Sequence, residues 1–306
     1  MFYITLFRVR PVAKNNGKNC DRKSKKSGKR EGGRDNSERR YHLPAAIICY
    51  ERHPTLKVLI LAALKQEIKY LLKDLSARKS GKGTWMARHG KTEAAIVLTG
   101  MGVENAAVRA KSALMAHKPS LVISAGFAGA LYEGAEYGEL VCPAKAFLHP
   151  GAPFHSGPGG SAPAALELAG PRYEDFFGTV SKKAGARRGS IVTLSVWVEK
   201  PAVRSFLPAG LSFPLCDMET FKIAETVMKT DAEFFALRSI TDKSDEEIGI
   251  SPMEMAGAGG QISTSLAVWR FVSNPGLIPR ALRFWRSSDK AARALSSALK
   301  GFILSL

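Results

Sequence analysis

Cysteines are few in this chain of 306 residues, and their spacing excludes two classes of site. The four cysteines form no CxxC pair, and no histidine stands at metal-ligand spacing from them, so we expect neither a zinc site nor a disulfide framework. They are Cys20, Cys49, Cys142 and Cys216. Free thiols are typical of a reducing compartment, so we predict a cytoplasmic protein.

Long apolar runs are missing as well. The longest uninterrupted run, residues 58–64, is far too short to span a bilayer. The first ten residues, MFYITLFRVR, are apolar and then basic, which is the reverse of a secretory signal, and no small-residue cleavage site follows them. We interpret this stretch as the product of a misplaced start codon or as a poorly ordered leader.

Acidic residues are scarce at both ends of the chain. The formal net charge is +18, of which residues 1–55 contribute +9 and residues 270–306 contribute +6, leaving only +3 for the middle. Basic ends attract nucleic acid or anionic lipid without specificity. The middle contains no nucleic-acid motif, so no specific nucleic-acid partner is expected.

Strand-like and helix-like patterns alternate once the basic N-terminal segment ends. Residues 11–40 contain almost no apolar residue, which predicts disorder, and we expect order to begin near Leu56. Strands are expected at 57–64, 93–100, 120–131, 138–143, 190–198 and 233–242, and helices at 66–75, 103–118 and about 217–228. This alternation indicates a layered α/β fold. Residues 148–171, rich in Gly, Pro and Ala, predict a long loop or lid.

Residues 279–304 predict an amphipathic C-terminal helix that begins with a proline in its first turn. Its basic stripe, at steps of three and four, consists of Arg283, Arg286, Lys290 and Arg293. Its apolar residues are Leu282, Trp285, Leu295, Leu299 and Phe302. Such a helix either packs on the domain or lies on an anionic membrane surface, and the pattern leaves both options open.

Four short motifs stand at strand ends or helix starts: ALKQE ending at Glu67, SAGFAGAL from Ser124, DMET from Asp217 and RSITD ending at Asp242. In this order they resemble the purine nucleoside phosphorylase/nucleosidase superfamily, and most of all its methylthioadenosine/S-adenosylhomocysteine nucleosidases. The resemblance covers about residues 56–265. It implies a three-layer α/β/α sandwich with a mixed central sheet, and it calls for no cofactor and no metal.

The expected organisation has three parts. Residues 1–55 form a disordered basic extension, residues 56–270 form the catalytic domain, and residues 271–306 form the basic amphipathic helix.

The resemblance assigns three carboxyl groups to the cleavage of an N-ribosidic bond. Asp242 matches the acid that protonates the purine, Glu67 the carboxylate that activates water, and Glu219 the carboxylate that binds the ribose hydroxyls. The residues alone also allow Asp242 to be a helix N-cap and Glu67 to be a solvated residue of a first helical turn.

The remaining predicted substrate contacts are apolar or small. Met218 would pack on the ribose, Trp197 would cover the purine and the backbone of Val198 would read the base edge, while Phe127 and Gly129 lie in the small-residue turn. Simple core filling is the alternative for Met218, and a buried core position is the alternative for Trp197.

The resemblance favours water over phosphate as the nucleophile. Phosphorylases of this superfamily carry an arginine and a serine where this chain has Ser124 and Phe127, and an aromatic ring cannot bind phosphate. A rebuilt phosphate site that uses Lys65 or Arg238 remains open. The expected substrate is a small purine nucleoside, with adenine as the base, and a homo-oligomer, dimer or trimer, is the expected assembly.

Two alternatives accompany this prediction. The related hopanoid-associated branch cleaves adenine from a lipid-linked adenosine, and a membrane-facing C-terminal helix would suit such a substrate. A protein that only binds nucleic acid or a membrane through its basic ends is the non-enzymatic alternative.

Overall fold

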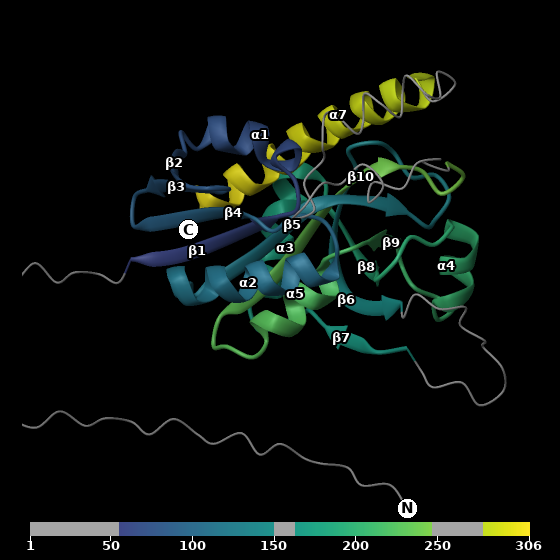
Figure 1. The fold of residues 1–306 in the computed structure, drawn as a ribbon, viewed down its shortest axis with the longest axis horizontal. Helices are drawn as coiled ribbons and strands as arrows, with labels where there is room; N and C mark the ends of the chain where they lie inside the picture. The colour runs from purple at the N-terminus through teal and green to yellow at the C-terminus, as the bar shows by residue number, and fades with distance from the viewer. Residues whose placement is uncertain (1–54, 150–162, 247–277) are drawn as a thin grey trace, which may run out of the picture. The chain divides into compact units, whose positions relative to one another are not determined.

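A computed structural model of the protein describes residues 55–149, 163–246 and 278–306. These residues form an α/β fold in which one sheet combines parallel and antiparallel strand pairs (Figure 1). The strands are β1 (Leu56–Ala62), β2 (Arg78–Gly81), β3 (Thr84–His89), β4 (Thr92–Leu98), β5 (Leu121–Ala130), β6 (Leu140–His149), β7 (Ala165–Glu167), β8 (Arg187–Leu194), β9 (Pro214–Asp217) and β10 (Glu233–Asp242). The helices are α1 (Lys65–Asp74), α2 (Val103–His117), α3 (Tyr173–Ala184), α4 (Lys200–Phe206), α5 (Thr220–Val227) and α7 (Ile278–Ile303).

The strand order is β10-β6-β8-β9-β5-β1-β4-β3-β2, with β7 added to β6. β1 lies between its parallel neighbours β4 and β5. β10 pairs with β5 in parallel and with β6 antiparallel, so the strands β5, β9, β8, β6 and β10 form a closed ring of pairings. The predicted mixed central sheet is confirmed.

Helices cover both faces of the sheet, and the alternation of β1 side chains explains why. Val58 and Ile60 belong to a core shared with α1, α3 and α7, whereas Leu59 and Leu61 belong to a core shared with α2 and α5. A strand that is buried on both faces carries apolar residues without interruption, as this one does. The predicted three-layer arrangement is therefore confirmed (Figure 1).

The predicted C-terminal helix is present as α7, and its two halves have different surroundings. In the second half Leu295, Leu299 and Phe302 are buried in the core, where the Phe302 ring meets the Phe176 ring with 4.8 Å between centroids. In the first half Leu282 and Trp285 remain 52% and 56% exposed. Packing on the domain therefore describes the second half of the helix.

Some predicted boundaries were wrong. β8 ends at Leu194, so Trp197 and Val198 lie beyond the strand and not within it. The short strand expected at 138–143 is the ten-residue β6, which pairs with β8 on one side and β10 on the other. Part of the predicted loop 148–171 forms β7.

Several predictions concern residues that the structure does not describe. The predicted disorder at 11–40, the N-terminal leader and loop residues 150–162 lie outside the described residues. Within the described ranges, no helix combines the length and the apolar content needed to cross a membrane.

Candidate active site

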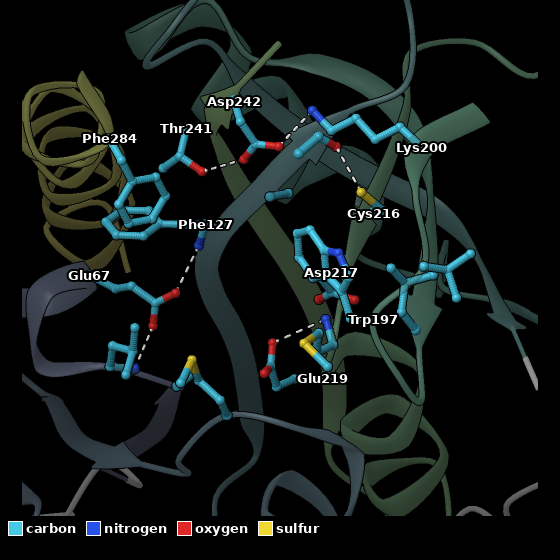
Figure 2. Close-up of a pocket in the computed structure, with 18 residues that line it drawn as sticks. Glu67, Phe127, Trp197, Lys200, Cys216, Asp217, Glu219, Thr241, Asp242 and Phe284 are labelled. Atoms are coloured by element: carbon cyan, nitrogen blue, oxygen red, sulfur yellow. Dashed lines mark hydrogen bonds and ion pairs between the residues drawn. The ribbon is translucent and has the colours of Figure 1, made fainter. Parts of the chain in front are cut away.

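All eight residues that the sequence predicted for the site line a single cavity (Figure 2). They come from α1, from β5, from the segment after β8, from the β9–α5 junction and from the end of β10. These residues are Glu67, Phe127, Gly129, Trp197, Val198, Met218, Glu219 and Asp242. The fold thus brings together side chains from five separate parts of the sequence, while their individual roles stay predictions.

Glu67 is buried in the first turn of α1. Its Oε2 accepts the Leu64 N–H at 2.7 Å, and its Oε1 accepts the Phe127 N–H at 2.9 Å. Burial raises the pKa of this carboxyl, and the backbone hydrogen bonds, together with the charge of Arg238, oppose that rise. Only 5% of Glu67 is exposed, so the alternative reading as a solvated residue does not hold.

Gly126 allows β5 to pass close to Glu67. A Cβ at this position would lie 2.8 Å from Oε1 of Glu67, a distance that real Cβ atoms essentially never show. The sequence prediction named Phe127 and Gly129 of the same motif but missed Gly126. Because Gly126 has no side chain, the amide of Phe127 can donate to the Glu67 carboxylate.

Glu219 lies at the N-cap position of α5, but its side chain does not cap the helix. Its Oε1 accepts the Gly102 N–H at 2.8 Å, and its Oε2 accepts the Met218 N–H at 3.3 Å. Burial raises the pKa of Glu219 to about 8, and the nearby charge of Asp217 raises it as well. The carboxyl group of Glu219 lines the cavity, and backbone amides hold it in place.

Asp217 and Arg238 form a buried ion pair at the back of the site. The Asp217 Oδ2 accepts hydrogen bonds from Nε and Nη2 of Arg238 at 3.1 and 3.0 Å, and the side chains are 1% and 3% exposed. Further donors of Arg238 reach the carbonyl and hydroxyl oxygens of Ser124, each at 2.8 Å, and the hydroxyl of Thr220. All N–H groups of the guanidinium are thus engaged by protein oxygens. The guanidinium holds the DMET motif against the SAGFAGAL motif.

Neither cation that remained open for phosphate binding lines the cavity. Arg238 is engaged inside the protein, and Lys65 is exposed at the start of α1. Among the described residues, Lys200 is the one basic side chain in the cavity wall. In the same part of the chain, no group of three or more His, Cys, Asp or Glu side chains is arranged to hold a metal ion.

Asp242 ends β10 and pairs with a cation. Its Oδ2 lies 2.6 Å from Nζ of Lys200, and its Oδ1 accepts the Thr241 hydroxyl at 2.9 Å (Figure 2). The β10–β5 register shifts between Ile240 and Asp242, and such a bulge re-aims the side chains that follow it. Residues 243–246, which directly follow Asp242 and are described, form no helix for its side chain to cap.

Gly129 gives this ion pair its space. A Cβ at Gly129 would collide with Oδ2 of Asp242 and would lie 3.2 Å from Cε of Lys200 and 3.1 Å from Sγ of Cys216. The geometry therefore explains Gly129 by clearance around Asp242, whereas the sequence prediction assigned it to substrate contact.

The apolar wall of the cavity mixes buried and open side chains. Trp197 is 40% exposed in the bend after β8, so the alternative of a buried core tryptophan is wrong. Met218 is buried in a small cluster with Leu194 and Phe206, and Val198 packs against that cluster. Met218 therefore both fills the core and lines the cavity.

The sequence prediction missed ten further cavity residues, five of which carry an ionisable, hydroxyl or aromatic group. These five are Lys200, Cys216, Asp217, Thr241 and Phe284. Asp217 and Thr241 belong to the quoted motifs, and each stands next to a predicted site residue. Including the neighbouring position in each motif would have found them. Lys200 and Phe284 carry no such signal, because α4 and α7 meet the site only through tertiary packing. Phe284 of α7 lines the same cavity as Phe127.

Comparison with known proteins gives nucleosidases of two names. The 5′-methylthioadenosine/S-adenosylhomocysteine nucleosidase of Listeria monocytogenes is 23% identical over 215 residues, which is 63% of this chain and 88% of that protein. The Helicobacter pylori enzyme of the same name has a similar structure, with a TM-score of 0.62 and 18% identity, over 83% of this chain and 100% of that chain. The futalosine hydrolase of Helicobacter pylori is equally similar, with a TM-score of 0.62, 18% identity and coverage of 82% and 99%.

The family model of the phosphorylase superfamily matches residues 57–271, a stretch that contains all eight predicted site residues. The match agrees with the resemblance inferred from the four motifs and with the mixed sheet. The chain therefore belongs to the phosphorylase superfamily.

Proposed function

We propose that this protein is a nucleosidase that hydrolyses the N-ribosidic bond of a purine nucleoside. One observation carries the proposal: the carboxyl groups of Glu67, Glu219 and Asp242, from three distant segments, line the same buried cavity. With Asp217, which pairs with Arg238, four acidic groups line this cavity, and such a cluster is costly unless a partner, a ligand or a reaction uses it. Cleavage of a nucleoside needs an acid, a base and a group that binds the sugar.

Each carboxyl group suits one of these tasks. Asp242 lies beside the cationic Lys200 and donates a proton to the leaving purine. Glu67 is held by two amide donors and orients and deprotonates the attacking water. Glu219 directs its carboxyl oxygens, held by backbone amides, to the two ribose hydroxyls and hydrogen-bonds to them.

The cavity wall favours water over phosphate as the nucleophile. Phe127 stands beside Glu67 with an apolar ring, and the guanidinium of Arg238 is fully engaged away from the cavity. Among the residues that the structure describes, the cavity wall offers a phosphate dianion one cation, Lys200, which already pairs with Asp242. Phosphorolysis is therefore the second choice.

Adenine nucleosides are the substrates that the relatives support best. Methylthioadenosine and S-adenosylhomocysteine appear in the names of the relatives, and futalosine appears in the name of a structural neighbour. We therefore propose adenine as the base and leave the 5′ substituent to the substrate panel.

The test is release of free base from methylthioadenosine, S-adenosylhomocysteine, adenosine, inosine and futalosine, with and without phosphate. We expect hydrolysis without phosphate and a loss of kcat/KM of about 10²- to 10⁴-fold in Asp242→Asn and Glu67→Gln. The exposed Asp231→Asn and Glu104→Gln are matched controls and should keep full activity. No release from any nucleoside would refute the proposal, and strict phosphate dependence would convert it to a phosphorylase.

A lipid-linked adenosine is a second candidate substrate, and one observation favours it. The exposed Leu282 and Trp285 stand on α7 together with basic residues, and Phe284 of the same turn lines the cavity. An apolar and basic helix face of this kind binds anionic membranes. Flotation with liposomes that contain anionic lipid should be lost in the double variant Leu282→Ser/Trp285→Ser, and unchanged flotation would exclude this face as the membrane contact.

We also propose that the protein forms a homo-oligomer. Val108 and Met115 of α2 are 66% and 70% exposed, and Met228 lies exposed at the end of α5. Exposed apolar side chains on neighbouring helices are common at subunit interfaces. Light scattering should give a mass of two or three chains, and a monomer would exclude this expectation.

A further inference from the structure

Lys200 is a buried cation that the proposed roles leave unused. It begins α4, and its Nζ lies 2.6 Å from Oδ2 of Asp242, with side-chain exposures of 11% and 8%. The same ammonium donates a hydrogen bond to the carbonyl oxygen of Lys243. Both side chains of the pair line the cavity, so both can reach a bound substrate.

The ion pair between Lys200 and Asp242 changes which group can hold the proton that the purine receives. The 2.6 Å between Nζ of Lys200 and Oδ2 of Asp242 is the distance of an ion pair, in which the ammonium group carries the proton and the carboxylate accepts its hydrogen bond. The transferable proton of the pair then resides on Lys200. A lysine ammonium can release that proton when its surroundings are poorly hydrated.

We propose that Lys200 is the proton source of the reaction and that Lys200 and Asp242 act as one proton-donating unit; this rests on the proposed function. One proton passes from the Lys200 ammonium to the Asp242 carboxylate and from there to a ring nitrogen of the purine. As it arrives, the bond between the sugar and the base breaks and its electron pair goes to the purine. The attacking water gives its hydroxyl to the sugar and its other proton to Glu67, and solvent later restores both groups.

The other groups around the pair do not compete for this role. The Cys216 thiol faces both Asp242 and Lys200, and burial raises its pKa to about 12, so it keeps its proton. Thr241 donates its hydroxyl to Asp242. Gly129 adds no side chain between the ammonium and the carboxylate.

A lysine that only neutralises the charge of Asp242 would lie at the same distance as one that donates a proton. Two substitutions separate charge neutralisation from proton donation. Lys200→Arg keeps the positive charge, but a guanidinium does not give up its proton in a protein. Lys200→Met removes both the charge and the proton. Lys222→Met, on the outer face of α5, is the matched control.

The assay compares two leaving groups. Purine nucleosides need a proton on the base, whereas 4-nitrophenyl riboside carries a leaving group that departs without one. We expect Lys200→Arg and Lys200→Met to lower kcat/KM on the purine nucleoside about 100-fold or more and on the nitrophenyl riboside less than about 5-fold. Asp242→Asn should show the same split, whereas Glu67→Gln should lower both rates together.

Several results would overturn the inference. They are recovery of purine cleavage in Lys200→Arg, an equal loss on both substrates, or no loss in either variant. If Lys200→Met does not fold, as thermal unfolding would reveal, Lys200→Arg still decides, because it preserves the ion pair. A wild-type protein that cleaves the nitrophenyl riboside but no purine nucleoside would refute the proposed function itself, and this inference with it.

Discussion

Two pairs of acidic side chains lie around the same cavity and are held in different ways. Glu67 and Glu219 accept hydrogen bonds from backbone amides, whereas Asp217 and Asp242 each pair with a buried cation. An amide carries only a partial charge, so burial still raises the pKa of both glutamates. The aspartates are therefore neutralised by side chains of the protein, while the two glutamates have no cation among the described residues as a hydrogen-bond partner.

The largest effect should come from breaking a cation-held pair. Arg238→Met leaves Asp217 charged and unpaired in the core, which costs about 3–5 kcal/mol and lowers the melting temperature by about 10 °C or more. Thermal unfolding monitored by circular dichroism measures this. The exposed Arg109→Met is the control, and an equal melting temperature for the two variants would show that the buried pair contributes nothing.

An amide-held carboxylate should be sensitive to small displacements. Gly126→Ala pushes a methyl group against Oε1 of Glu67, and a misplacement of about 1 Å at a catalytic group costs about 100-fold in rate. Steady-state kinetics measures kcat/KM. Gly178→Ala, in α3 with open space around it, should leave the rate unchanged, and a Gly126→Ala variant with full activity would contradict the assigned geometry.

The raised pKa of Glu219 predicts a pH-dependent stability. The carboxyl group titrates at about 8 in the folded protein against an ordinary 4.5, so its contribution to stability is present below pH 4.5 and is lost as the pH rises through 8. Glu219→Gln removes this titration. The melting temperature of the wild type should therefore fall more steeply between pH 5 and pH 8.5 than that of the variant, and parallel curves would exclude the shift.

The smallest effect should come from a carboxylate that is paired near the surface. Asp289 of α7 lies 2.6 Å from Nζ of Lys69 and accepts a hydrogen bond from Tyr70, and these contacts lower its pKa. Partly exposed pairs contribute little, so Asp289→Asn should change the melting temperature by no more than about 2 °C. A shift as large as that of Arg238→Met would remove the distinction between buried and surface pairs.

Much of the fold could be predicted because its central strands are buried on both sides. The strands β1, β4 and β10 each contain an uninterrupted apolar run, at residues 58–62, 94–98 and 234–237, and α1 and α2 show the helical period. The β2–β3 hairpin was missed because Arg78–Gly81 is exposed along its whole length and has no apolar alternation. Helix α4 was missed because it has only seven residues, with Pro201 in its first turn.

The site could be predicted as a set of residues but not as a set of contacts. The motifs placed Glu67, Glu219 and Asp242 at element ends, where ligands gather. Pairing depends on packing between distant segments, so the sequence did not reveal that Lys200 meets Asp242. The bulge before Asp242 also has no sequence signal, since no glycine or proline marks it.

The ring of five strands has a consequence for biosynthesis. β10 is the last of these strands to leave the ribosome, and it closes the ring between β5 and β6 while bringing Asp242 to the cavity. Contacts between segments so far apart in sequence form late and slowly. A nascent or truncated chain that ends before β10 has Glu67 and Glu219 but lacks Asp242, so under the proposed function it stays inactive until β10 has been made.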